Sequence, residues 1–216
     1  MFERHKEKKA LEQYQAELAQ WQSLHDGYAE MIQLAQGPGG FDSNEIILKK
    51  GEHVVAKVTS ASLVEDRRGR GTYTGGSQGV SIPVGSIHGR SVRYRVGATR
   101  GHYVQGAPVP TAIDVGIVFI TNQRVIFQGT KQTRECLFAK LIGIEHDDSA
   151  GTTVVSVSNR QKPTVIHYGP AIAGWFDFRT DFALAQFKGT VAELVQSLQT
   201  ELAGIEQTRP VQPSTS

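Results

Sequence analysis

The chain has 216 residues, one cysteine and a formal net charge of +2. The length suits one sizeable domain with an appendage or two small domains, and a lone cysteine excludes both an internal disulfide and a cluster of thiolate metal ligands. The charge is too small to indicate nucleic-acid binding by itself, and the sequence contains no apolar run of about eighteen residues that would span a membrane. We therefore expect a cytoplasmic protein in which any membrane contact is peripheral, at the inner membrane face.

Residues 1–36 are predicted to form an amphipathic, coiled-coil-like helix. Its larger apolar residues recur at spacings of three and four, the a/d pattern of a helix that packs one narrow stripe on a partner; they are Leu11, Tyr14, Leu18, Trp21, Tyr28 and Ile32. The glycine- and proline-rich segment 37–40 ends the helix. Two interpretations stay open, a helix laid on its own domain and a helix that pairs in a coiled-coil dimer, because about three heptads are marginal for independent pairing.

From about Asn44 to Phe178 the hydrophobic period changes to two, and β-branched residues and glycine-rich turns dominate, which is typical of β-strands. Short polar connections such as Thr121-Asn122-Gln123 join the later strands, so successive strands are expected to pair antiparallel as a meander. The predicted strands are His53–Val64, Val80–Val84, Ser91–Val96, Ile113–Thr121, Arg124–Gln128, Thr133–Phe138, Leu141–Glu145, Thr153–Ser158 and Thr164–Tyr168.

A final helix is predicted after Thr190, which with Glu193 matches a capping box. The aromatic segment 175–187 before it is either a short helix or a strand, and its rings are expected to pack beneath the final helix. The β domain therefore spans residues 41–205, and the polar tail 206–216 is expected to be disordered. The apolar residues of the final helix share one face; they are Val191, Leu194, Val195, Leu198, Leu202 and Ile205.

The segment Asp114–Gly129 reads DVGIVFITNQRVIFQG, an apolar strand that ends in Thr-Asn-x-Arg and is followed at once by a second strand. It resembles the strand–turn–strand signature of bacterial PH-like and GRAM-like domains, and Leu141–Glu145 is similar to the next strand of that family. The resemblance implies an α+β, mainly antiparallel β fold, a PH-like partly open barrel capped by a C-terminal helix and preceded here by the N-terminal amphipathic helix. It also implies a non-enzymatic interaction or scaffold module.

Thr121, Asn122 and Arg124 belong to the turn of this signature. Arg124 opens a strand directly after a tight turn, so its guanidinium can reach back to the turn carbonyls. We expect a structural role for these three residues in preference to contact with a ligand.

The stretch between Asp66 and Asp114 contains no acidic residue and is rich in arginine and glycine. Arginine binds phosphate bidentately, and in phosphoinositide-binding members of the family the first strands carry an Arg-x-Arg pair, which Arg93 and Arg95 match. The alternative is a solvated hairpin whose arginines discourage edge pairing. The candidate anion-binding residues are Arg67, Arg68, Arg70, Arg90, Arg93, Arg95 and Arg100.

The sequence contains only weak matches to motifs of catalytic sites. The glycine-rich segments 69–71 and 74–79 lack the Gly-Lys-Ser/Thr ending and the strand-to-helix context of a phosphate loop. The histidines are scattered without a pair at metal-ligand spacing, and Cys136 is expected to be a buried structural residue. We expect no enzyme activity, no cofactor and no metal; an enzyme whose site is assembled from distant residues is a third alternative.

The expected function is therefore a protein-interaction module that uses the N-terminal helix for docking or self-association. The alternative is a peripheral membrane module that binds anionic lipid headgroups through the arginine-rich hairpin. Nucleic acid is disfavoured as a partner, because the arginine stretch lacks regularly interleaved aromatic residues and offers only Tyr73, Tyr94 and Tyr103.

Overall fold

The computed structural model describes residues 2–87 and 90–213, with side chains described for residues 8–67 and 107–213. The chain divides into two units, one of Met1–Leu63 with Asp114–Ser216 and one of Val64–Ile113. Its elements in chain order are α1 (Phe2–Gln36), β1 (Val54–Ile87), β2 (Arg90–Thr121), β3 (Arg124–Gly129), β4 (Thr133–Leu137), β5 (Leu141–Asp147), β6 (Thr152–Val157), β7 (Thr164–His167), α2 (Ala173–Lys188) and α3 (Val191–Gln207), with short 3-10 helices at Phe138–Lys140 and Pro170–Ile172.

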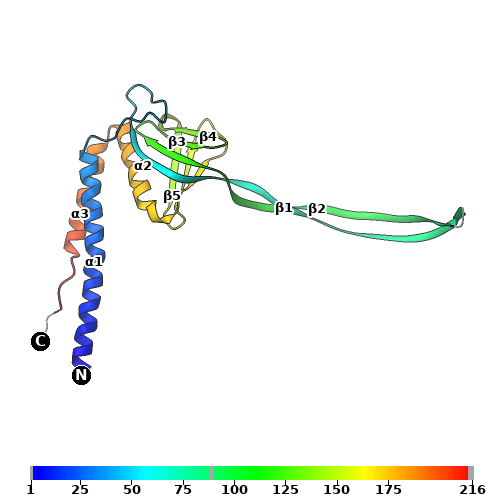
Figure 1. The fold of residues 1–216 in the computed structure, drawn as a ribbon, viewed down its shortest axis with the longest axis horizontal. Coiled ribbons are helices and arrows are strands. Elements are labelled where there is room, and N and C mark those ends of the chain that lie inside the picture. Colours follow the sequence, from blue (N-terminus) through cyan, green and yellow to red (C-terminus); the bar gives the residue numbers. More distant parts are fainter. Residues whose placement is uncertain (1, 88–89, 214–216) are drawn as a thin grey trace. The chain divides into compact units, whose positions relative to one another are not determined.

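The strands of the described chain form one seven-stranded sheet in the order β4-β3-β2-β1-β7-β6-β5 (Figure 1). Neighbouring strands along the chain pair antiparallel, as in β2–β3, β3–β4, β5–β6 and β6–β7. The predicted α+β, mainly antiparallel fold is confirmed. The sheet is not closed, because β4 and β5 form its two edges.

Alternating apolar residues hold the centre of the sheet in register. Val118 lies opposite Phe127 and Ile120 lies opposite Val125, and all four side chains are buried. Residues two apart on a strand share a face, and Phe119 and Ile126 on the opposite face are buried too, so β2 and β3 are covered on both sides here. Gly116 allows β2 and β3 to approach closely, since a Cβ there would collide with the carbonyl oxygen of Gln128.

The arginine- and glycine-rich segment is a hairpin made of the long strands β1 and β2, which two residues connect. Four shorter strands were expected in this region; the first two merge into β1 and the other two into β2. Glycine keeps both backbone hydrogen-bonding groups, so two facing strands can continue through glycines that mark turns in the sequence. The predicted breaks at those glycines are therefore wrong.

The helix that packs on the sheet is α2, and not the final helix as expected. Its Phe176 and Phe182 are buried, and the Phe176 ring stacks on Tyr168 with 4.0 Å between ring centroids. The segment whose type stayed open is thus a helix. At the start of α3, Thr190 makes no side-chain capping hydrogen bond, so the predicted capping box does not form.

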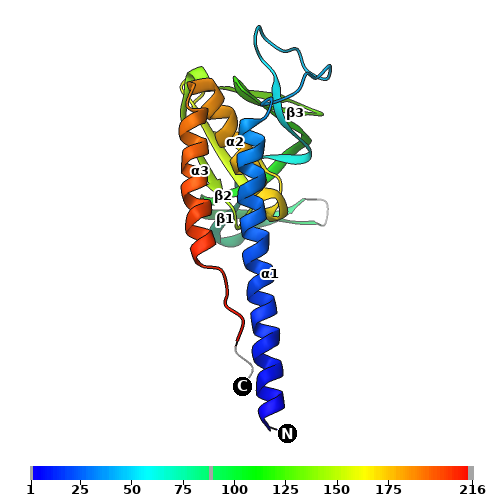
Figure 2. The same cartoon turned by 90° about the vertical axis from the view of Figure 1, so that its left-hand side faces the viewer.

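The final helix α3 instead packs against α1, and none of its residues is fully buried. Trp21 Nε1 donates to the Ile205 carbonyl at 2.8 Å, and the Tyr28 hydroxyl donates to Glu201 Oε2 at 2.9 Å, so the two helices run antiparallel. Figure 2 shows them side by side, with α1 continuing past the end of α3. Among the described residues, none of the helices combines the length and hydrophobicity needed to cross a bilayer.

Candidate functional site

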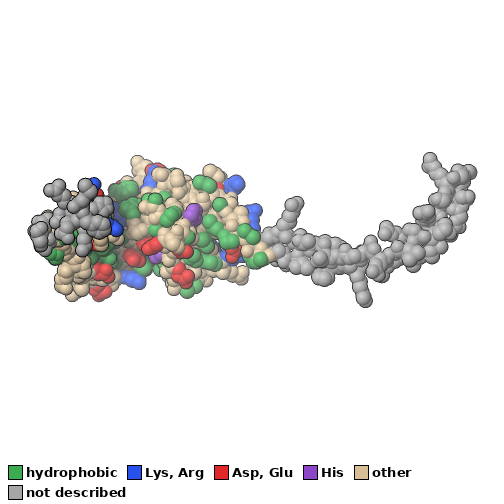
Figure 3. Space-filling view, turned by 90° about the horizontal axis from the view of Figure 1, so that it is seen from below, with side chains coloured by type: hydrophobic (Ala, Val, Ile, Leu, Met, Phe, Trp, Pro, Cys, Tyr) green, Lys and Arg blue, Asp and Glu red, His purple; other side chains and the backbone are tan. Residues whose placement is uncertain are grey.

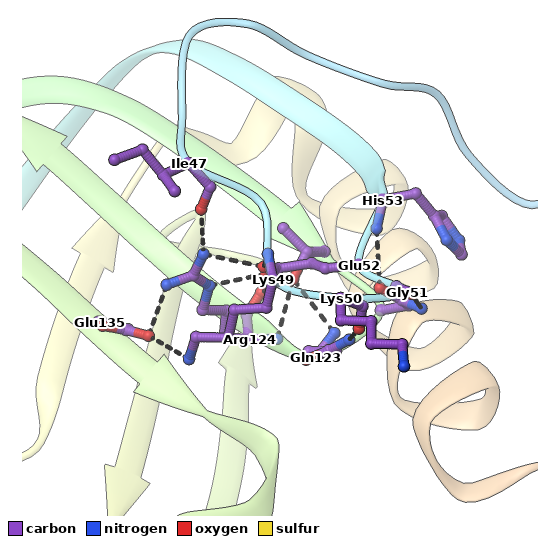
Figure 4. A network of polar contacts seen from close by, with 11 residues as sticks. Ile47, Lys49, Lys50, Gly51, Glu52, His53, Gln123, Arg124 and Glu135 are labelled. Atoms are coloured by element: carbon purple, nitrogen blue, oxygen red, sulfur yellow. Dashed lines mark hydrogen bonds and ion pairs between the residues drawn. The ribbon is translucent and has the colours of Figure 1, made fainter.

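The turn after β2 carries a network of charged side chains (Figure 4). Arg124 donates from Nε to Glu52 Oε1 at 2.7 Å and from Nη2 to Glu52 Oε2 at 2.9 Å, which makes a bidentate ion pair. Its Nη1 lies 2.6 Å from Oε1 of Glu135, and Nη2 also donates to the carbonyl of Ile47 at 2.7 Å. The side chains of Arg124 and Glu52 are 9% and 0% exposed, so this pair is held away from water.

Further donors surround the buried carboxylate. The Lys49 backbone N–H and the Thr121 hydroxyl each donate to Glu52 at 2.7 Å. Burial by itself would raise the pKa of Glu52, but the hydrogen bonds from Arg124, Lys49 and Thr121 outweigh it and hold that pKa below its usual value. Burial opposes the charge of Arg124 as well, and the bonds to Glu52 and Glu135 raise its pKa. Both groups therefore remain charged at neutral pH.

The predicted turn residues all contact the chain itself. Thr121 Oγ1 accepts hydrogen bonds from the backbone N–H groups of Gln123 and Arg124, at 3.1 and 3.0 Å. Asn122 accepts from the His53 N–H and donates to the Gly51 carbonyl, both at 3.0 Å. The guanidinium of Arg124 was expected to reach back to the turn carbonyls; it binds Glu52 and Glu135 instead. These contacts fasten the segment before β1 onto the turn between β2 and β3.

A second polar cluster lies between β5, β6 and α2. His146 Nδ1 lies 2.7 Å from Asp177 Oδ1 and 2.8 Å from Thr153 Oγ1, and the Tyr168 hydroxyl donates to Asp177 Oδ1 at 3.2 Å. Burial raises the pKa of Asp177 to about 7, and the nearby Asp148 adds to the shift. Burial also lowers the pKa of His146, so near pH 7 the imidazole is mostly neutral, whereas Asp177 is about half protonated.

Perturbed pKa values such as these are common at functional sites. The described residues of this cluster nevertheless lack the other features of a catalytic site. His146 Nε2 is buried and has no hydrogen-bond partner, and Thr153 is fully buried, so neither presents a reactive atom to solvent. Within the described residues, no group of three or more His, Cys, Asp or Glu side chains could hold a metal ion. Cys136 is also buried, its Sγ lies 3.4 Å from Thr164 Oγ1, and burial raises the pKa of its thiol.

The apolar stripe of α1 divides into two parts. Trp21, Tyr28 and Ile32 lie where α3 runs alongside, so this part of the helix packs on its own domain, one of the two open interpretations. The Trp21 ring also stacks on His25, with 5.0 Å between ring centroids. Nearer the N-terminus, Leu11 is 42% exposed, while Tyr14 and Leu18 are half-buried.

The predicted anion-binding arginines fall in β1 and β2. Arg67 is exposed, and the other six side chains lie outside the residues whose side chains the structure describes; they are those of Arg68, Arg70, Arg90, Arg93, Arg95 and Arg100. The prediction that they bind anions therefore stays a prediction. On the face of the protein in Figure 3, acidic and basic side chains are scattered among apolar ones.

Comparison with protein-family models, with curated proteins and with solved structures found no match. The PH-like resemblance therefore rests on the sequence of Asp114–Gly129. What the structure establishes is an α+β fold with a mostly antiparallel, unclosed sheet and C-terminal helices.

Glu52, Asp177 and Arg179 are three residues that the sequence analysis did not single out. Glu52 pairs with a residue 72 positions away in the chain, and Asp177 meets His146 only because α2 lies on the sheet. Arg179 lies two residues after Asp177 on the same helix. No local pattern marks Glu52 or Asp177, since each gains its partners through tertiary packing, and Arg179 becomes notable only because α2 places it in a groove.

Proposed function

We propose that this protein is a non-enzymatic, PH-like interaction module that self-associates through the helix pair α1–α3. The proposal rests mainly on the part of α1 that precedes Trp21. Because Trp21 bonds to Ile205 and α3 ends at Gln207, residues 2–20 extend past the end of α3. Nineteen helical residues correspond to about 28 Å of helix, which is long for a segment that α3 does not cover.

The apolar stripe supports the proposal because it continues into this segment in the same phase. Leu11, Tyr14 and Leu18 keep the heptad spacing of Trp21 and Tyr28. Leu11 remains 42% exposed, and Leu24, which flanks the stripe further along, is 51% exposed. A helix that only lay on its own domain would need no apolar residues beyond the end of α3.

The seam between α1 and α3 is also incompletely covered. The valine, leucine and isoleucine side chains of α3 are all half-buried, although they share one face of the helix. Two antiparallel helices cannot enclose an apolar seam, whereas two such pairs can do so as a four-helix bundle. A second copy of the chain supplies a matching pair, so the favoured partner is the protein itself.

The strand order supports the PH-like part of the proposal. Strands β1 to β4 follow one another across one half of the sheet, strands β5 to β7 across the other, and α2 packs on the sheet after the last strand. This arrangement agrees with a twisted antiparallel sheet followed by a C-terminal helix, which the resemblance of Asp114–Gly129 implies.

The experiment is multi-angle light scattering after size-exclusion chromatography, over loading concentrations of about 1 to 100 µM. The chain mass is 23.6 kDa, and we expect the wild type to shift from this mass to twice this mass as concentration rises. The double variant Leu11→Glu/Leu18→Glu is expected to stay monomeric, because it places charges in the seam and leaves the hydrogen bonds of Trp21 and Tyr28 to α3 in place.

The matched control is Ala16→Glu/Ser23→Glu, which adds the same charges on the opposite, exposed side of α1. It is expected to dimerise like the wild type. Circular dichroism should show equal helix content in all three proteins. A wild type that stays at the monomer mass at every concentration, or a control that dissociates like the seam variant, would rule out self-association through this helix.

The arginine-rich hairpin supports the alternative function, binding of anionic lipid headgroups. Its segment between Asp66 and Asp114 has no acidic residue to oppose the arginines. Co-sedimentation with vesicles of phosphatidylcholine, with and without an anionic lipid, tests this function. Binding that requires the anionic lipid, weakens with salt and disappears in Arg93→Ala/Arg95→Ala supports it, and absence of binding at low salt excludes it.

A further inference from the structure

A groove with a volume of about 760 Å³ lies between the end of α1, the segment that follows it, β1 and α2. This size falls within the range of small-molecule sites. Two aromatic residues that line the groove have exposed side chains, Phe41 at 50% and Trp175 at 37%. Most of its walls are apolar, and they include Leu34, Pro38, Phe41, Val55, Ala56, Trp175 and Phe182.

Arg179 places a positive charge in this apolar groove, and no carboxylate of the described residues forms an ion pair with it. Its Nε is buried and has no hydrogen-bond partner, and its Nη1 makes only a long contact of 3.5 Å to the Val55 carbonyl. The guanidinium lies over the Trp175 ring, 5.4 Å from the centroid. Burial lowers the pKa of Arg179. The negative charge of Glu30, which also lines the groove, partly opposes that shift.

The other charged lining residues leave Arg179 available to a ligand. Lys57 donates to both carboxylate oxygens of Glu45, at 2.6 and 2.7 Å, so its charge is neutralised. Glu30 is exposed, and among the described residues no carboxylate oxygen lies within ion-pair distance of Arg179. A half-buried guanidinium whose Nε is buried without an acceptor is costly, and an incoming carboxylate can accept from the guanidinium in a charge-assisted pair.

We infer that this groove binds a small amphiphilic carboxylate, with its apolar chain along the groove walls and its carboxylate on Arg179. The walls consist of side chains that offer apolar contact and few hydrogen-bonding groups, so an alkyl chain matches them better than a peptide backbone does. The carboxylate supplies the acceptors that Arg179 lacks. This inference does not require self-association, because its anchor, Arg179, is on α2 and belongs to neither helix of the α1–α3 pair.

The experiment is isothermal titration calorimetry of the full chain with dodecanoate below its micelle concentration. Dodecan-1-ol serves as the neutral ligand of equal length and acetate as the head group alone. We expect dodecanoate to bind at least tenfold more tightly than dodecan-1-ol, and acetate not to bind measurably. Since Trp175 lines the groove, its fluorescence should change on binding, and a Trp21→Phe background isolates this signal from the other tryptophan.

Variants identify the groove as the site. Arg179→Gln should weaken dodecanoate binding at least tenfold and leave dodecan-1-ol binding unchanged. Glu30→Gln should strengthen dodecanoate binding, because it removes the competing negative charge. Lys162→Gln, an exposed loop residue, is the control for loss of one positive charge and should bind as the wild type does.

Other results would overturn the inference. Equal binding of dodecanoate and dodecan-1-ol would show that Arg179 is not the anchor, and equal weakening by Lys162→Gln would show a general charge effect. A short apolar peptide with a free C-terminal carboxylate that binds tenfold more tightly than dodecanoate would make the occupant a peptide. Repeating the titration with Leu11→Glu/Leu18→Glu separates failure of this site from failure of self-association.

Discussion

Replacing Arg124 with methionine tests how strongly the buried ion pair stabilises the fold. The variant keeps much of the aliphatic length but leaves the Glu52 carboxylate, which is 0% exposed, with only the donors from Lys49 and Thr121. Removing one partner of a buried pair costs about 3–5 kcal/mol, because the other charge stays desolvated and uncompensated. For a chain of this size that cost lowers Tm by about 6–20 °C.

The control is Lys49→Met, which removes a pair with Glu135 whose side chains are 43% and 40% exposed. Exposed pairs contribute about 0–1 kcal/mol, so this variant should lie close to the wild type. Urea unfolding followed by circular dichroism measures both free energies of unfolding. The double variant Arg124→Met/Glu52→Leu should be more stable than Arg124→Met alone, because it removes the unpaired carboxylate.

The pH dependence follows from the direction of the Glu52 shift. Its folded pKa lies below the usual value of 4.5, so the stabilisation is fully present above that value and is lost as pH falls through the folded pKa. The difference between wild type and Arg124→Met should therefore be constant near neutral pH and shrink in acid. Equal costs for Arg124→Met and Lys49→Met at pH 7 would refute this reasoning about burial.

Three further predictions concern local structure. Thr190→Ala should lower the free energy of unfolding by about 0.5 kcal/mol or less, because Thr190 makes no side-chain capping bond. Replacing an N-cap residue that does make this bond costs about 1 kcal/mol. A larger loss in urea unfolding would contradict the absence of the capping bond. Gly116→Ala should cost about 1–3 kcal/mol by overpacking against Gln128, whereas Gly143→Ala, where a Cβ meets nothing within 4 Å, should be nearly neutral in the same assay. The folded pKa of Asp177 is raised from 3.8 to about 7, so the free energy of unfolding should fall as pH rises through 7. Asp177→Asn should show a smaller fall over this range. If urea unfolding from pH 5 to pH 8 gave the same pH dependence for both proteins, the raised pKa would be contradicted.

Much of the strand pattern could be predicted because it depends on local sequence. From Arg124 onward, apolar alternation and polar turns predict each strand to within about two residues, since side-chain period and turn chemistry are short-range properties. The N-terminal helix was equally predictable, and it ends at Gln36 directly before the Gly-Pro segment. The hairpin was harder to predict, because its glycines mark turns in the sequence and yet lie inside two continuous strands.

The type of the aromatic segment and the partner of the final helix depended on tertiary structure. Residues 175–187 have aromatic rings on several sides, so periodicity alone does not separate helix from strand; the helix is favoured because α2 packs Phe176 and Phe182 against the sheet. The apolar face of α3 was evident from its sequence, but whether it meets the sheet or α1 depends on where the chain turns at Gly189, which has a φ of 75°.

The sequence by itself determined the N-terminal helix and its heptad stripe, the strands from Arg124 onward and their antiparallel pairing, because each follows from side-chain spacing along a few residues. Only the tertiary structure decided which charged groups meet. Glu52 with Arg124, Asp177 with His146, and Arg179 in the groove are brought to their surroundings by packing between distant segments. Burial then sets their pKa values and hydrogen-bond needs, and burial is a property of the folded chain that no local pattern carries.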